Sequence, residues 1–138
     1  MNINPTIWKI KEKIINHNEI KIIDETDNSI TIKPDGDNTF PITVIIKDNK
    51  YSVYFKGWHE NFNTEEEALD VFAFGLSEDC RLRVIVVKDI EYKWILEFKE
   101  KNKWIKNSEK NIGMFPLWLK KQEKIYQNHV IKNLDLKK

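Results

Sequence analysis

The stretch GWHENFNTEEEALDVFAFGLSEDCRLR, residues 57–83, joins a strand end, a capped helix and the start of another strand. Thr64 and Glu67 form a T-x-x-E capping box, and the glutamates after Thr64 complement the positive end of a helix dipole. We therefore expect a helix that begins at Glu65. The apolar residues on one stripe of this helix are Leu69, Phe72 and Leu76.

The residues before this stretch predict one helix and two hairpins. Asn4 followed by Pro5 is typical of a helix start, and the helix is expected to run to about Ile15 or Asn18. EIKIID and SITIK, separated by ETDN, predict a first hairpin. FPITVIIKDNKYSVYFKGW predicts a second hairpin that turns at Asp48–Asn49.

The residues after it predict a meander and a last helix. RLRVIVVKD, EYKWILEFKE and KNKWIKN have strand composition and are joined by short polar turns. A helix is expected to begin near Phe115–Pro116, and residues 132–138 are expected to fray. Its predicted apolar face consists of Phe115, Trp118, Leu119, Ile125, Tyr126 and Val130.

These patterns predict a single α+β domain over residues 1–138. The expected order is α-ββ-ββ-α-βββ-α, with three helices packed on a twisted, mainly antiparallel sheet, because short turns join antiparallel neighbours. Ile45, Tyr54 and Ile95 lie on the face opposite the main apolar positions. Either helices cover both faces, which is the expectation given three helices, or one face forms a groove or partner surface.

Composition excludes several classes of function. The chain has 138 residues, 41% of them apolar, and 33% charged with a net charge of +1, which offers no basic face for nucleic acid. The single cysteine excludes an internal disulfide and is typical of a reducing compartment. The N-terminal residues lack a signal sequence, and no apolar run could span a membrane. We expect a soluble, cytoplasmic protein.

No familiar catalytic motif occurs in the sequence, and no catalytic residue or cofactor is predicted. His59 beside Glu60 is a candidate general base, although neighbouring residues in a strand point to opposite sides. Cys80 follows an acidic pair, which disfavours a thiolate, so a buried structural role is expected. No metal site is predicted, because the three histidines are not spaced as a ligand pair.

Arg81 and Arg83 are the only arginines, although the chain contains many lysines. In a strand, their spacing places both guanidiniums on one face, where each can bind a carboxylate or phosphate through two parallel bonds. The preferred interpretation is structural pairing that locks the strand to the helix. The alternative is a clamp for an acidic ligand. The candidate structural partners are Glu60, Asp70, Glu78 and Asp79.

Residues 51–128 resemble a family of small bacterial proteins of unknown function. The resemblance lies in GWHENF, EEALDVFAFGLS, CRL and the later FPLW. It implies that residues 57–60, 74–75 and 80–81 act together, as a pocket or as a structural corner. It implies no activity.

Two functional hypotheses follow from the sequence. The first is a small non-enzymatic binding protein that contacts another protein, of the immunity or adaptor kind. The second is an enzyme or a binder of a small anionic ligand, built on His59, Glu60, Arg81 and Arg83. Trp58, next to His59, is a further candidate binding residue. The five tryptophans are otherwise expected in packing, with Trp8 and Trp118 partly exposed.

Overall fold

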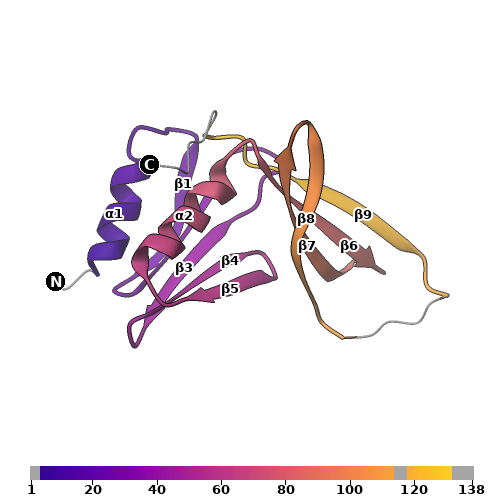
Figure 1. Cartoon of the computed structure of the whole chain (residues 1–138), viewed down its shortest axis with the longest axis horizontal. Coiled ribbons are helices and arrows are strands. Elements are labelled where there is room, and N and C mark those ends of the chain that lie inside the picture. Colours follow the sequence, from indigo (N-terminus) through magenta and orange to yellow (C-terminus); the bar gives the residue numbers. More distant parts are fainter. Residues whose placement is uncertain (1–3, 114–117, 132–138) are drawn as a thin grey trace.

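The computed structural model describes residues 4–113 and 118–131, which form an α+β fold with two antiparallel sheets (Figure 1). The first sheet has the strand order β1-β2-β3-β4-β5 and the second has the order β8-β7-β6-β9. The elements are α1 (Pro5–Ile14), β1 (Ile20–Thr26), β2 (Ser29–Pro34), β3 (Ile42–Lys47), β4 (Lys50–Phe55), β5 (Trp58–Phe62), α2 (Glu65–Leu76), β6 (Cys80–Val87), β7 (Ile90–Glu100), β8 (Lys103–Asn111) and β9 (Lys121–Tyr126).

Local sequence signals set the helix starts and the hairpin turns as predicted. The Asn4 side chain accepts a hydrogen bond from the Thr6 amide at 2.8 Å, and Thr64 caps α2. Asp48 and Asn49 both have positive φ, as in the two-residue turns whose twist matches that of the flanking strands. The same backbone geometry at residues 88–89 and 101–102 makes β6, β7 and β8 the predicted meander.

Two predictions about the element order were wrong. Residues 58–62 form a fifth strand of the first sheet, paired with β4, where the sequence predicted only the end of a hairpin. Residues 121–126 form β9, which pairs antiparallel with β6, where a last helix was expected. The described residues therefore contain two helices rather than three. The expected helix start at residues 115–116 and the tail at 132–138 lie outside the described residues.

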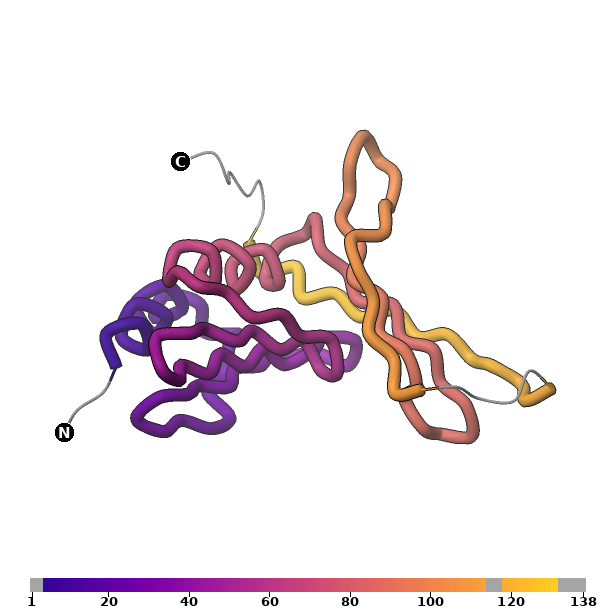
Figure 2. Tube along the Cα trace, turned by 60° about the horizontal axis from the view of Figure 1, so that its bottom comes forward, coloured from indigo at the N-terminus to yellow at the C-terminus, as the bar shows by residue number. Residues whose placement is uncertain are grey.

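Both helices lie on the same side of the first sheet (Figure 2). The side chains of Ile7 and Ile10 from α1 and Phe72 and Leu76 from α2 are buried in one core with alternate residues of β2, β3 and β4. The expectation that helices would cover both faces is wrong for this sheet. Within residues 4–113 and 118–131, no helix covers its other face, because both helices pack on the same side.

The two sheets meet at the start of β5. The Trp58 indole Nε1 donates a hydrogen bond to Ser108 Oγ at 2.8 Å, which links the first sheet to β8. Gly57 lies so close to the Trp94 ring that a Cβ atom there would overlap the indole. Gly75 is similarly close to the Phe55 ring, as expected for close helix–sheet approach.

A short segment after β9, which we call the strap (residues 127–131), ties the second sheet to the first. The Asn128 side chain is buried; its Oδ1 accepts from the Phe40 amide at 2.8 Å and its Nδ2 donates to the Gly75 carbonyl at 3.0 Å. The last two strap amides donate to the Leu76 carbonyl at 2.8 and 2.9 Å. The strap therefore holds the end of α2, the loop before β3 and β9 in one arrangement.

Candidate functional site

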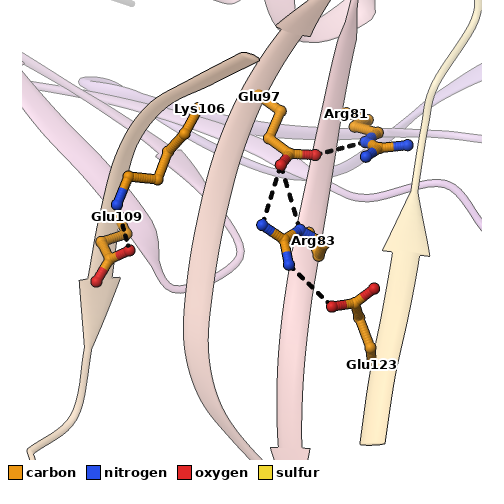
Figure 3. A network of polar contacts seen from close by, with 6 residues as sticks. All are labelled: Arg81, Arg83, Glu97, Lys106, Glu109 and Glu123. Carbon is orange, nitrogen blue, oxygen red and sulfur yellow. Dashed lines mark hydrogen bonds and ion pairs between the residues drawn. The ribbon is translucent and has the colours of Figure 1, made fainter. Parts of the chain in front are cut away.

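Arg81 and Arg83 lie on the same face of β6, as their spacing predicted, and both bind Glu97 of β7 (Figure 3). Arg81 Nε lies 2.5 Å from Glu97 Oε1, and Arg83 Nη2 lies 3.1 Å from Glu97 Oε2. Glu97 is only 4% exposed. Two guanidiniums therefore satisfy one buried carboxylate, an arrangement that needs the planar fork of arginine.

Further ion pairs on the second sheet involve β8 and β9. Arg83 Nη1 lies 2.9 Å from Glu123 on β9, and Glu109 on β8 pairs with Lys106 at 3.0 Å and with Lys93 at 3.6 Å. We call these seven residues the ion lattice: Arg81, Arg83, Lys93, Glu97, Lys106, Glu109 and Glu123.

The ion lattice shifts the pKa values of Arg83 and Glu109 toward their charged forms. Hydrogen bonding to Glu123, and to a smaller extent the charges of Glu97 and Glu123, raises the pKa of Arg83 although burial opposes this. Hydrogen bonding from Lys106 lowers the pKa of Glu109. The Arg81 guanidinium also stacks over the Trp104 ring, 4.6 Å from the centroid.

The sequence correctly predicted structural pairing of the arginines but not their partners. Glu60, Asp70, Glu78 and Asp79 were expected, as a lock between strand and helix. The partners are instead Glu97 and Glu123 on the neighbouring strands, because the β6–β7 register places Arg81 directly opposite Glu97. The two guanidiniums therefore join β6 to β7 and β9, and not to a helix.

His59 and Glu60 lie on opposite faces of β5 and do not form a catalytic pair. His59 stacks on Tyr54, with the ring centroids 5.0 Å apart, and its Nδ1 lies 3.4 Å from the Gly57 carbonyl. Glu60 is opposite Val53, on the side that carries the core residues of β4. An imidazole and a carboxylate that face away from each other cannot share a proton.

Trp58 and Cys80 are both buried. The Trp58 ring stacks on Phe55 at 4.9 Å and is 1% exposed, so it serves the junction of the sheets. Burial raises the pKa of the Cys80 thiol well above its usual value, which disfavours the nucleophilic thiolate. The structural role expected for Cys80 is confirmed.

The predicted site residues therefore come together only in part. Arg81 and Arg83 share Glu97, whereas the contacts of His59 in the described residues are with Tyr54 and Gly57 of the other sheet. Among residues 4–113 and 118–131, no three His, Cys, Asp or Glu side chains form a group that could hold a metal ion.

The open face of the first sheet brings together Ile45, Tyr54 and His59, which the sequence pointed to separately, with short polar residues that it did not. Pairing across β2, β3, β4 and β5 aligns two rows of side chains that contain no Asp, Glu, Lys or Arg. We call this surface the neutral face: Ser29, Ile45, Ser52 and Asn61 in one row, and Thr31, Thr43, Tyr54 and His59 in the other.

Hydrogen bonds organise the neutral face from within. The hydroxyls of Thr31 and Thr43 lie 2.8 Å apart, and Ser52 Oγ donates to Asn61 Oδ1 at 2.6 Å. The signal for this face was present in the sequence as short polar residues that alternate with buried ones. Their common face became visible only when the strand order was known.

Neither helix in the described part of the chain has the length and apolar character needed to cross a membrane. Comparisons with protein-family models, with curated proteins and with solved structures find no match for this chain. The resemblance of residues 51–128 to a bacterial family therefore stays an expectation, and a functional assignment depends on the two open sheet faces.

Proposed function

We propose that this protein is a small non-enzymatic binding protein whose neutral face docks another protein. The observation that carries the proposal is the contrast between the two open sheet faces. In a chain with 33% charged residues, the centre of the neutral face has hydroxyl, amide and aromatic side chains around Ile45. The charged residues on the same side of the sheet lie at its margins: Asp24 on the edge strand and Lys33, Lys47 and Lys50 near strand ends. The face of the second sheet holds the ion lattice, whose charges are paired with one another.

A face of this kind can be buried at low free-energy cost. Removing an unpaired charge from water is expensive, which is why the centres of protein interfaces are depleted in Lys, Glu and Asp and enriched in aromatic residues. Tyr54 offers a rigid aromatic surface with a hydroxyl at its tip, and short Ser, Thr and Asn side chains adapt their hydrogen bonds to a partner. Because strand backbone is already ordered, these side chains bind a partner without a large further loss of conformational entropy.

The cost of burying an unpaired charge also restricts the surface of the partner. A protein that buries the neutral face must present an uncharged, hydrogen-bonding surface of its own, because a charged residue placed against Ile45 and Thr43 would have no counter-ion. The partner proposed is therefore a folded protein with a neutral polar patch.

No observation favours the alternative function, an enzyme or a binder of an anionic ligand. That function needs His59, Glu60, Arg81 and Arg83 to converge on one empty position. The guanidiniums of both arginines are engaged by Glu97, and His59 and Glu60 point to opposite sides of β5.

Photo-crosslinking from the two faces tests the proposal. A benzoylphenylalanine residue in place of Tyr54 is expected to capture a protein in the native lysate that the same residue in place of Trp104, beside the ion lattice, does not capture. The captured protein is then purified and its Kd measured with the wild-type chain. Equal capture at the two positions would contradict the proposal.

Charge insertion provides a matched comparison. Thr43→Lys and Asn61→Lys, on the neutral face, are expected to raise the Kd at least about tenfold, which corresponds to about 1.4 kcal/mol. Asn111→Lys, on the edge strand of the other sheet, is expected to leave the Kd unchanged. Unaltered binding by all three variants, with wild-type melting temperatures, would exclude the neutral face as the interface.

A further inference from the structure

A second surface, away from the neutral face, lies where α1 runs beside the free edge strand β1. A cavity of about 370 Å³ separates them, lined mainly by apolar side chains. We call this surface the α1–β1 groove. The side chains from α1 and β1 that line it include Trp8, Ile15, Ile20 and Ile22.

The apolar exposure in this region is unusually concentrated. Among the described residues, eight large hydrophobic side chains are exposed, and four of them lie on α1, on β1 or next to α1. These are Trp8, Ile15, Ile22 and Ile23, which are exposed by 53%, 73%, 43% and 61%. A cluster of this size on one side of a molecule marks an interaction surface rather than scattered surface residues.

The edge strand itself is open to pairing. In the described part of the chain, β1 pairs with β2 alone, so its other side presents backbone groups that are open to a further strand. Many proteins protect such an edge with a bulge or with charges. β1 has a bulge at Ile23, but the inserted residue is apolar and exposed, so the bulge adds to the apolar surface instead of reducing it.

The charges of β1 are self-complementary. The central residues are Lys21, Ile22, Ile23 and Asp24 in sequence. If two copies of this strand lie antiparallel with the two-fold axis between the isoleucines, Lys21 of each copy faces Asp24 of the other. A parallel arrangement would place lysine against lysine. Lys21 is available for this contact, because its only described ion pair, with Asp35, is 3.8 Å long and largely exposed.

We propose that the α1–β1 groove binds a second copy of this chain, with the two β1 strands antiparallel. The arrangement joins two five-stranded sheets into one continuous sheet. It also brings the groove of each copy against that of the other, so that the same residues are covered on both sides of a two-fold axis. The neutral face lies on the opposite side of the sheet from the helices and stays accessible in the dimer.

Charge reversal tests this pairing on the full-length chain by sedimentation equilibrium from about 1 μM to 1 mM. The wild-type chain is expected to dimerise. Lys21→Glu and Asp24→Lys are each expected to weaken self-association at least about tenfold, because each brings like charges together at both ends of the pair. Lys103→Glu, an exposed lysine of the second sheet, serves as the matched control and is expected to dimerise as the wild type does.

Recombining the charges distinguishes this geometry from any other. The double variant Lys21→Glu/Asp24→Lys restores both opposite-charge contacts and is expected to dimerise again. A mixture of the two single variants is expected to form a heterodimer, because both acidic side chains of the first variant then face lysines of the second. A wild-type chain that stays monomeric up to about 1 mM, or a double variant that stays dissociated, would overturn the proposal.

The outcome is separable from that of the proposed function. Thr43→Lys, which tests the neutral face, is expected to leave the dimer intact. If β1 instead accepts a strand from a different protein, the wild-type chain sediments as a monomer. The charge-reversed variants then have the same monomeric mass, and the proposed dimer is contradicted.

Discussion

Glu97 is the residue on which both arginines of the chain depend. It accepts Arg81 on one carboxylate oxygen and Arg83 on the other, while it is itself almost fully buried. A lysine would supply a single point charge from a flexible stem and could not keep this geometry. The retention of arginine at two positions of a lysine-rich chain therefore has a local structural reason.

Replacing Glu97 is expected to lower the free energy of unfolding more than replacing a more exposed glutamate of the ion lattice. Glu97→Gln leaves two guanidiniums without their shared carboxylate, and we expect the free energy of unfolding to fall by about 3 kcal/mol, near the low end for buried pairs because the arginines remain partly exposed. Glu109→Gln, the same substitution at a more exposed site, is expected to cost less than about 1 kcal/mol. Urea unfolding at constant m-value measures the free energy of unfolding of both variants. Equal losses in the two variants would contradict a larger contribution from the buried Glu97.

At this scale the sequence predicted roles better than partners. It predicted that the arginines would pair and that Cys80 would be buried, because residue type and immediate neighbours determine these properties. It did not predict Glu97, which is 16 positions away from Arg81 and reaches it only through the β6–β7 register. It placed Ile45 and Tyr54 on the face opposite the core and offered a partner surface there as the alternative, but it did not predict the other members of the neutral face, which come from four strands.

At the scale of elements, the strap shows how a segment without regular structure can hold a fold together. Asn128 binds the Phe40 amide and the Gly75 carbonyl at the same time, and both groups belong to the first sheet and its helix. The amide side chain can do this because it carries a donor and an acceptor side by side.

Loss of the Asn128 amide is expected to destabilise the protein strongly. Asn128→Ala leaves a buried N–H and a buried C=O unsatisfied, and we expect a loss of about 3 kcal/mol in the free energy of unfolding. Asn128→Asp keeps the acceptor and loses the donor, so its loss of hydrogen bonds is smaller but it adds a buried charge. Gln122→Ala, at an exposed site on β9, is the control. Thermal unfolding that is unchanged in Asn128→Ala would mean that the strap is not required.

The contact between α1 and α2 predicts a dependence on pH. Hydrogen bonds from Lys9 and then from Thr6 lower the pKa of Glu65 below its usual 4.5, and the same contact raises the pKa of Lys9 above 10.5. A lowered carboxyl pKa stabilises the fold above pH 4.5, and this stabilisation is lost as the pH falls through the folded pKa. A raised lysine pKa stabilises below pH 10.5 and is lost as the pH rises through its folded value.

The difference in stability between the wild type and Glu65→Gln is therefore expected to be constant from about pH 6 to 9 and to shrink at both extremes. Chemical unfolding across the pH range measures it. Glu66→Gln, in the same first turn of α2, shares the helix dipole but not the contact with Lys9, and it is expected to follow the wild-type profile. A Glu65→Gln difference that grows in acid would contradict the assignment.

The last predicted helix is replaced by a strand over residues 121–126. The apolar spacing of Ile125, Tyr126 and Val130 suits a helix, yet residues 121–126 pair with residues 82–87 of β6. A strand edge that is already formed offers backbone hydrogen bonds at no nucleation cost, and this tertiary contact outweighs the weak local preference.

The whole molecule consists of two sheets that share one core. Trp58, Gly57 and the strap connect them, and residues of both sheets and both helices belong to the same buried cluster. The two described helices cover one face of the first sheet and leave the neutral face uncovered, whereas the ion lattice lies on the second sheet.

We expect the two sheets to unfold together. In hydrogen exchange with mass spectrometry, peptides from β3–β4 and from β6–β7 are predicted to report the same opening free energy to within about 1 kcal/mol, and Asn128→Ala is predicted to lower both equally. Values that differ by more than about 2 kcal/mol would mean that the sheets are independent units and that the chain is not the single domain expected from its length.

The sequence by itself determined the helix caps, the two-residue turns, the alternation along the strands and the balance of charge, because each depends on residues within a few positions of one another. The tertiary structure alone decided that β9 is a strand, that Glu97 receives both arginines, and that the short polar residues of four strands share the centre of one sheet face. These outcomes depend on contacts such as that between Phe40 and Asn128, which lie 88 positions apart. The spacing of residue types within one segment does not specify which strands will pair, so it cannot predict such contacts.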